Sequence, residues 1–268
     1  MIKVIAISDT HGDLPKIEEV FDLLLVGGDI APNFDHVRTY DREGQRFWFQ
    51  NTFVQWVVSL PFSDENSKVV FIGGNHDFWL EEESGSFNTD GYSAIWPDVI
   101  IPCSNRLVYL YDQTYRFTKG GEYIDVYGTP WCKVFGRWAF MIPDNKLELA
   151  FNNIPENVDI LLTHDAPAIP PYGFITEGNW AGEDAGNKPL AKAIMEKKPR
   201  WAVHGHIHSS PHEIGVVSHP DGTSTNIACV SYKNESYSPV YSPLVFEVDG
   251  HTVENKTTEN STDNDIQN

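Results

Sequence analysis

The sequence has few cysteines, and none of them are paired at a metal-binding or disulfide spacing. Only three of its 268 residues are cysteine, namely Cys103, Cys132 and Cys229, and they lie far apart in the chain. An odd number of cysteines without a Cys-x-x-Cys pair argues against a disulfide framework and against a cysteine-ligated zinc site. We therefore expect three reduced, buried thiols and a cytoplasmic protein.

Long apolar runs are also absent. No stretch approaches the roughly 20 apolar residues that a membrane-spanning helix needs. The first apolar segment, Met1–Ile7, is shorter than the apolar region of an export signal, and the polar residue Asp9 follows almost at once. We expect a strand at this position and no association with a membrane.

Basic residues are scarce. The chain has 19 lysines and arginines against 38 aspartates and glutamates, which gives a formal net charge of −19. A surface this acidic repels the long phosphate backbone of extended nucleic acid, which we therefore exclude as a partner. A small phosphate ester, such as a nucleotide, remains compatible, because divalent ions in a cleft would dominate the local charge there. The sequence does not indicate an oligomeric state.

Length and composition predict one folded domain and a polar tail. A chain of 268 residues that is 41% hydrophobic can bury a sizeable core in a single domain. Residues 255–268 are almost entirely polar, with Ile266 as the one apolar residue, and cannot offset the entropy of ordering. We predict a domain over residues 1–254 and a disordered tail over residues 255–268.

Five short apolar runs, each typical of a strand, are followed by polar motifs. The runs are residues 3–8, 21–26, 68–72, 159–163 and 201–203, and the motifs that end them are Asp9-Thr10-His11, Gly28-Asp29, Gly74-Asn75-His76-Asp77, Thr163-His164 and Gly205-His206-Ile207-His208. In open α/β sheets, ligands bind at the carboxyl ends of the strands, where loops from neighbouring strands face one crevice. The glycines allow a close approach of the backbone to an ion. The sequence therefore predicts that these motifs meet.

The side chains in these motifs suit divalent metal ions. Carboxylate oxygen, amide oxygen and imidazole nitrogen are preferred by hard and borderline ions, and no thiolate is among them. The predicted ligands are Asp9, His11, Asp29, Asn75, His164, His206 and His208. Mixed nitrogen and oxygen ligation favours an open, hydrolytic pair of ions, about 3.5–4 Å apart, over a closed structural zinc site. A bridging carboxylate is needed between them, and Asp29 is the best candidate.

The ordered motifs from Asp9 to His208 resemble those of the calcineurin-like metallophosphoesterase superfamily. The resemblance implies an α/β fold, a sandwich of two mixed β-sheets flanked by α-helices. It also implies that Asp9, His11, Asp29 and His208 hold one ion and that Asp29, Asn75, His164 and His206 hold the other. His76 would protonate the leaving oxygen and Asp77 would orient His76. Manganese, iron, zinc or nickel fits such ligands, and we favour manganese.

A narrower resemblance concerns the segments Tyr127-Gly128-Thr129-Pro130-Trp131, Trp138-Ala139-Phe140, 159–164 and 205–208. They are similar to the branch of metallophosphoesterase-domain proteins that act on nucleotide phosphodiesters, including 2′,3′-cyclic ones. The chain departs from that branch by reading His164-Asp165-Ala166-Pro167 in place of His-Gly-Pro-Pro, and by carrying His204 where an apolar residue is common. The resemblance implies hydrolysis of a small nucleotide-type phosphodiester by a metal-bridging hydroxide.

Other functions remain as alternatives. Gly28-Asp29-Ile30-Ala31 lacks the Asp-Arg-Gly continuation typical of serine/threonine protein phosphatases, whose arginine grips a phosphomonoester dianion. Phosphomonoesterase and nuclease activities stay open, although the acidic charge disfavours a nuclease. A non-catalytic metal-binding scaffold is the alternative from another class, and it is disfavoured because such relatives usually lose ligands.

Further residues receive roles from their position in the chain. We predict a short amphipathic helix that begins at residues 14–18, after Asp13, with apolar spacing through Val20 and Leu24, and a second helix at residues 47–60. Arg38 and Arg42 are candidates for contacting a substrate phosphate, and Tyr172 and Trp180, in a Gly- and Pro-containing loop after His164, are candidates for contacting a base. His204 is interpreted as a packed strand residue rather than as support for a ligand. Trp131, Trp138 and Phe140 are expected in the core, and Glu81-Glu82-Glu83 at a solvated edge.

Overall fold

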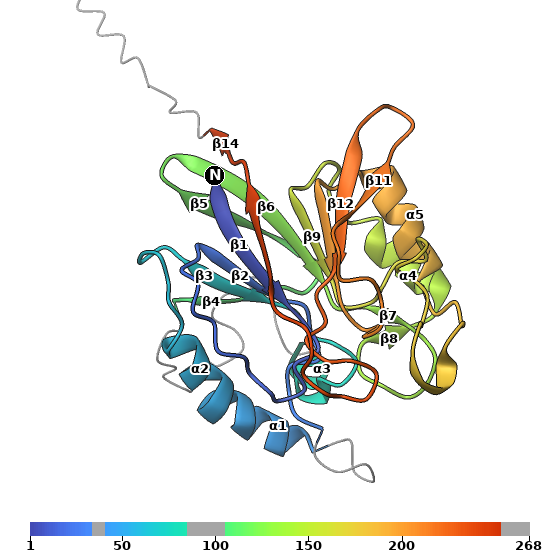
Figure 1. Cartoon of the computed structure of the whole chain (residues 1–268), viewed down its shortest axis with the longest axis horizontal. Coiled ribbons are helices and arrows are strands. Elements are labelled where there is room, and N and C mark those ends of the chain that lie inside the picture. Colours follow the sequence, from blue (N-terminus) through green and yellow to red (C-terminus); the bar gives the residue numbers. More distant parts are fainter. Residues whose placement is uncertain (34–40, 85–104, 253–268) are drawn as a thin grey trace, which may run out of the picture.

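Two β-sheets pack face to face, and helices cover their outer faces (Figure 1). The computed structural model describes residues 1–33, 41–84 and 105–252. The first sheet has the order β13 (Leu244–Val248), β1 (Ile2–Ile7), β2 (Leu23–Val26), β3 (Lys68–Phe71) and β4 (Leu107–Tyr109). Strands β1 to β4 are parallel, and β13 is antiparallel to β1.

The second sheet is also mixed. Its order is β11 (Gly215–Ser218), β12 (Ser224–Cys229), β10 (Trp201–His204), β9 (Ile160–Thr163), β6 (Glu122–Thr129) and β14 (His251–Thr252), with β5 (Gln113–Lys119) also paired to β6. The four strands β12, β10, β9 and β6 run parallel. A small separate sheet joins β7 (Cys132–Lys133) to β8 (Met141–Ile142).

The alternation of apolar side chains along the strands divides the core into layers. In β1, Val4 and Ala6 face the second sheet, whereas Ile5 and Ile7 face the helices on the outer side. The outer helices of the first sheet are α1 (Arg42–Trp48), the π-helix η1 (Phe49–Phe53), α2 (Val54–Val58) and α3 (Phe78–Ser84). The outer helices of the second sheet are α4 (Asp144–Phe151) and α5 (Lys188–Lys197). This arrangement confirms the predicted sandwich.

Most of the predicted elements are present. The five predicted strands correspond to β1, β2, β3, β9 and β10. The helix predicted at residues 47–60 corresponds to most of the continuous run of α1, η1 and α2, which begins earlier, at Arg42, and ends at Val58. The helix predicted at residues 14–18 is wrong, because this segment has no helical structure. Instead, Leu14 and Ile17 pack on the core, and the carbonyl of Pro15 accepts a hydrogen bond from Trp56 Nε1 at 2.8 Å. Tertiary contacts override the propensity of so short a segment.

The structure also bears on the predictions about the cysteines, the C-terminal tail and membrane-spanning helices. Cys132 and Cys229 are free and buried, as expected, and burial raises the pKa of both thiols. Cys103 and the predicted tail lie outside the described residues. In the part of the chain that the structure describes, no helix is both long and apolar enough to span a membrane.

Candidate metal centre

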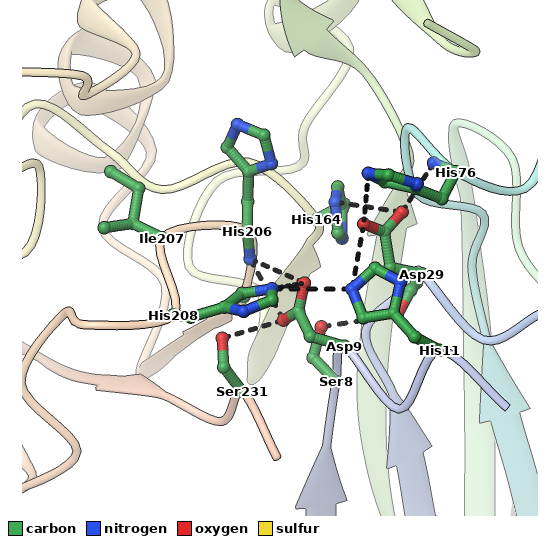
Figure 2. Close-up of polar contacts among 12 residues, drawn as sticks. Ser8, Asp9, His11, Asp29, His76, His164, His206, Ile207, His208 and Ser231 are labelled. Atoms are coloured by element: carbon green, nitrogen blue, oxygen red, sulfur yellow. Dashed lines mark hydrogen bonds and ion pairs between the residues drawn. The ribbon is translucent and has the colours of Figure 1, made fainter. Parts of the chain in front are cut away.

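The carboxyl ends of strands from both sheets meet at one edge of the sandwich. Asp9 follows β1, Asp29 follows β2, and the loop after β3 carries Asn75. His164 follows β9, and His208 lies four residues after the end of β10. A parallel bridge between Ser8 and Ser231 joins the two sheets at this edge. The side chains of the two sheets therefore face each other, as Figure 2 shows for Asp9, Asp29 and His164.

One buried group consists of Asp9, His11 and His208, whose candidate ligand atoms lie within 4.8 Å of one another. His208 Nε2 is 3.3 Å from Asp9 Oδ1, and His11 Nε2 is 3.5 Å from His208 Nε2. The second oxygen of Asp9 accepts a hydrogen bond of 2.7 Å from Ser231 Oγ. The Ser231 hydroxyl thus fixes the carboxylate while Oδ1 faces the histidines.

Asp29 lies between two sets of imidazoles. Its Oδ1 is 3.4 Å from His164 Nε2, and its Oδ2 is 3.7 Å from His11 Nε2 and 3.9 Å from His76 Nε2. Asn75 Oδ1 is 2.9 Å from His164 Nε2. The two oxygens of one carboxylate therefore face different groups of donors, an arrangement that can serve two adjacent ions.

Two of the histidines are oriented by backbone carbonyls. His164 Nδ1 is 2.8 Å from the carbonyl of Gly27, and His208 Nδ1 is 2.9 Å from the carbonyl of Asn234. Since a carbonyl can only accept, Nδ1 carries a proton in each ring and Nε2 is left to face the carboxylates. Metal-binding histidines are typically held in this way. The donor set and its orientation therefore fit divalent ions.

The electrostatic field of the cluster attracts positive charge. Burial disfavours the charged form of His164 and His208, but Asp29 and Asp9 outweigh it and raise their pKa values to about 10 and about 9. Burial dominates at His11 and lowers its pKa to about 3. Burial raises the pKa of Asp29, yet the surrounding histidines, His164 foremost, hold it well below its usual range. Buried carboxylates that need a cationic partner are typical of metal sites.

Four of the predicted ligands have a strained backbone. Asp9, His11, Asp29 and His206 have φ angles of 53°, 43°, 50° and 69°, in the left-handed region that non-glycine residues rarely adopt. Each such conformation costs about 1–2 kcal/mol. Hydrogen bonds between the turns maintain the strain, since Asp9 N donates to the carbonyl of Gly28 at 3.0 Å and His11 N donates to that of Asp29 at 2.9 Å.

Two glycines permit the close approach that the sequence predicted. A Cβ atom on Gly205 would lie 2.3 Å from Asp9 Oδ2, and one on Gly74 would lie 2.3 Å from Asp29 Oδ1. Any other residue at these positions would push the carboxylates out of place. Gly205 and Gly74 are thus required by the spacing of the cluster.

His206 contacts the cluster differently from the other predicted ligands. Its backbone N–H donates to Asp9 at 3.1 Å, and Figure 2 shows its ring directed away from that carboxylate. The ring centroid lies 5.2 Å from that of His164, and Nε2 lies 3.9 Å from Asp165 Oδ1. The ring therefore borders the His164 side of the cluster.

His76 is present at the cluster, but its polar partner is not the predicted one. His76 Nδ1 is 2.7 Å from Asn33 Oδ1, and its ring packs against Trp138, with centroids 4.5 Å apart and an interplanar angle of 35°. The Asp77 carboxylate instead accepts backbone hydrogen bonds from Ile30, Ala31 and Gly74. Asn33 thus takes the orienting contact that the resemblance assigned to Asp77, because the turn directs the Asp77 side chain to the loop that carries Asp29.

A cleft of about 500 Å³ opens over the cluster. Apart from the predicted metal ligands and His76, its lining is mainly aromatic and acidic: Phe135, Trp138, Trp180 and Tyr237 with Glu183, Asp184 and Glu235, together with Lys133, Ile175, Ala185 and Ile207. Among the described lining residues, Lys133 is the one lysine or arginine. The cleft therefore offers flat apolar walls and little positive charge besides the cluster.

The four predicted substrate contacts lie in different places. Trp180 lines the cleft and is 64% exposed. The base contact predicted for Tyr172 is wrong, because this side chain is buried. It packs edge-on against His204 and donates its hydroxyl proton to the carbonyl of Glu213. Arg42 does not line the cleft, and its Nε is 3.2 Å from Glu82 Oε2. Arg38 lies outside the described residues.

The remaining predictions concern packing. His204 is buried in β10 and burial lowers its pKa to about 4, in agreement with a packed strand residue. Phe140 is fully buried, whereas Trp131 and Trp138 are partly buried against the core. Glu82 is exposed, as expected at a solvated edge, but Glu81 accepts a hydrogen bond of 2.7 Å from the backbone of Phe140.

Sequence reasoning missed several residues that support the cluster. Ser231 had a detectable signal, since it follows the apolar end of β12 as the predicted ligands follow their strands. Asn33 and Asn234 lie in loops and had no such signal. Asp165 appeared only as a departure from a motif; it is buried and accepts hydrogen bonds from Lys133 N and Asn187 Nδ2, both at 2.8 Å. It thereby holds the backbone at Lys133, which lines the cleft.

Comparisons with known proteins agree with this geometry. The family described as calcineurin-like phosphoesterase matches residues 2–210. Metallophosphoesterase domain-containing protein 1 of Homo sapiens is 29% identical over 259 residues, covering 92% of this chain and 71% of the human protein. A UPF0046 protein of Caenorhabditis elegans is 26% identical and covers 92% of this chain and 81% of its own length. One solved structure superimposes with a TM-score of 0.52 at 16% identity, covering 84% of this chain and 89% of that one, which shows the fold alone.

Proposed function

Because this chain belongs to the calcineurin-like phosphoesterase family, and so is a metal-dependent phosphoric ester hydrolase, we propose that it hydrolyses a small nucleotide-type phosphodiester at a site for two divalent ions. The observation that carries the proposal is the position of Asp29, whose two oxygens face His164 on one side and His11 on the other. Such a carboxylate can be shared by adjacent ions.

The family resemblance and the geometry together suggest how the ligands divide. Asp9, His11, Asp29 and His208 would hold one ion, and Asp29, Asn75, His164 and His206 would hold the other. When bound, a pair of ions supplies Lewis-acid chemistry that activates water and neutralises charge on the phosphoryl oxygens. Manganese is our favoured metal, since oxygen and imidazole ligands accept it and no thiolate lies among them.

His76 is the proposed proton donor to the leaving oxygen. Asn33 Oδ1 accepts from Nδ1–H, so that Nε2, which lies 3.9 Å from Asp29 Oδ2, is the atom that faces the cluster. Burial lowers the pKa of His76, which makes its protonated form a stronger acid toward an alkoxide. Trp138 packs against the ring and restricts its orientation.

Asp77 has a positioning role in this proposal. Burial, together with the nearby charge of Asp29, raises the pKa of Asp77 to about 7. Its carboxylate receives N–H groups from both the Asp29 loop, at Ala31, and the Asn75 loop, at Gly74, each at 2.9 Å. Asp77 therefore fixes the distance between the two loops that carry Asp29 and Asn75.

The lining of the cleft supports a diester with a flat substituent. A phosphodiester carries one negative charge, which suits a cleft whose described lining residues include Lys133 but no arginine. Trp180 and Phe135 are exposed at this cleft and offer aromatic faces on which a base can stack. The acidic side chains Glu183 and Asp184 disfavour substrates with several phosphates.

One panel of substrates tests the proposal. The manganese-loaded protein is assayed on bis(p-nitrophenyl) phosphate, p-nitrophenyl phosphate, 2′,3′-cyclic nucleotides and single-stranded DNA. We expect turnover of the first and third substrates above the other two. Preference for p-nitrophenyl phosphate would indicate a phosphomonoesterase, and preference for DNA a nuclease. Metal uptake without turnover of any ester would indicate a scaffold.

A further inference from the structure

Tyr237 lies over the histidines of the cluster, although it belongs to a segment beyond the family match, which ends at residue 210. The centroid of its ring is 4.8 Å from that of His11, 5.3 Å from that of His208 and 6.4 Å from that of His76. Tyr237 also lines the cleft and is 45% exposed. It therefore borders both the proposed ligands and the space for a substrate.

A strained turn holds Tyr237 in this place. Its φ angle is 59°, and its N–H donates to the carbonyl of Asn234 at 2.8 Å. The same carbonyl faces His208 Nδ1 at 2.9 Å, and Asn234 Oδ1 accepts from the N–H groups of Ser236 and Ser238. A bulky residue in the left-handed region persists only where the surroundings determine it. One carbonyl thus orients His208 and positions Tyr237 together.

The Tyr237 hydroxyl is available to a ligand. Within the described part of the chain it makes no hydrogen bond to the protein, and the Tyr237 residue is 45% exposed. A phenol is protonated at neutral pH and can donate a hydrogen bond. By contrast, the Tyr172 hydroxyl donates to a backbone carbonyl and lies away from the cleft.

We propose that Tyr237 contacts the substrate and favours diesters, its hydroxyl donating a hydrogen bond to a non-bridging oxygen of the phosphoryl group. This inference rests on the proposed function. A phenol adds a donor without adding positive charge, so it satisfies one oxygen of a monoanionic diester. It does not neutralise the second negative charge of a phosphomonoester, as the bidentate guanidinium of an arginine would.

Three variants test the contact. Tyr237→Phe removes only the hydroxyl, and Tyr237→Arg supplies a cation at the same position. Tyr241→Phe is the matched control, because Tyr241 stacks on His212 with centroids 3.5 Å apart and does not line the cleft. For each manganese-loaded protein, kcat and KM are measured on bis(p-nitrophenyl) phosphate and p-nitrophenyl phosphate, together with metal content, melting temperature and calorimetric binding of dimethyl phosphate.

We expect Tyr237→Phe to lower kcat/KM on the diester and to weaken dimethyl phosphate binding, each by about tenfold, with metal content and melting temperature unchanged. Tyr237→Arg should raise the ratio of monoester to diester turnover by about tenfold. The control should match the wild type. If Tyr237→Phe also matches the wild type in binding, the contact does not exist, whatever the turnover. Wild-type protein that binds dimethyl phosphate through Tyr237 but hydrolyses no ester would refute the proposed function and leave the contact standing.

Discussion

The cluster of candidate metal ligands and the walls of the cleft above it are built in opposite ways. Asp9 and His164 are fully buried at the ends of strands, whereas Phe135, Trp180 and Tyr237 on the walls are 53%, 64% and 45% exposed. Phe135 and Tyr237 lie in loops, and Trp180 is the last residue of a short 3₁₀ helix, η2 (Gly178–Trp180). The strands are fixed by the apolar layers on both faces of each sheet. The difference indicates that the fold determines the reaction, while the loops determine which ester reaches it.

We expect the largest effect from removing the carboxylate that the two proposed ions share. Asp29→Ala leaves the histidines around it without their common partner, and we expect loss of bound manganese and a fall in kcat/KM of at least about 1,000-fold. Elemental analysis and the bis(p-nitrophenyl) phosphate assay measure both. Asp125→Asn, which affects an exposed ion pair with Arg116, is the control. A metal-loaded, active Asp29→Ala protein would contradict the bridging role.

His76 tests whether proton donation can be separated from metal binding. We expect His76→Ala to keep its metal and to lose about 100-fold in turnover, because it removes the proposed acid. The loss should be larger for a 2′,3′-cyclic nucleotide, whose leaving group is an alkoxide, than for a nitrophenyl ester. Equal losses on both esters would argue against proton donation.

Asn33→Ala tests whether Asn33 orients His76. The variant removes the acceptor that holds His76 Nδ1, and we expect a loss of about tenfold in turnover. In a protein that already carries His76→Ala, the same substitution should have no further effect, because the partner is gone. Additive losses in this double-mutant cycle would show that Asn33 acts independently of His76.

Gly205 tests the rigidity of the cluster through stability. Gly205→Ala places a methyl group 2.1 Å from Ser8 Oγ and 2.3 Å from Asp9 Oδ2, so the two sheets must move apart at this edge. We expect a loss of about 1–3 kcal/mol, measured by denaturant unfolding, together with weaker manganese binding. Gly120→Ala is the control, since nothing lies within 4 Å of its Cβ position, although its φ of +58° adds strain. Its manganese binding should not change.

Substitution of Trp180 tests the role of the cleft walls, and we expect it to have the smallest effect on catalysis. Trp180→Ala should raise KM for a nucleotide diester by about fivefold, through lost stacking, and leave KM for dimethyl-type esters unchanged. Phe47→Ala is the control, because Phe47 is 68% exposed on α1 and does not line the cleft. An equal rise in KM for both classes of ester would mean that Trp180 does not recognise the base.

The sequence predicted the parts that depend on burial and strand ends. Asp29 and His164 were found because each follows an apolar run, and runs of this kind form β2 and β9. It could not predict where a side chain points within a turn: the Asp77 carboxylate faces backbone N–H groups, and Tyr172 packs into the core. Asn33 and Tyr237 lie in loops without periodicity, so their proximity to His76 and His11 is visible only in the folded structure.

Stability and activity conflict at four turns, because the left-handed backbone lowers the stability of the fold where the side chains serve the proposed reaction. These turns are at Asp9, His11, Asp29 and His206. Glycine at any of these positions would relieve the strain and remove a proposed ligand. Inactive descendants of this enzyme would then be easier to fold than their ancestor. Without selection for hydrolysis, stability alone would favour the loss of the proposed ligands at these four turns.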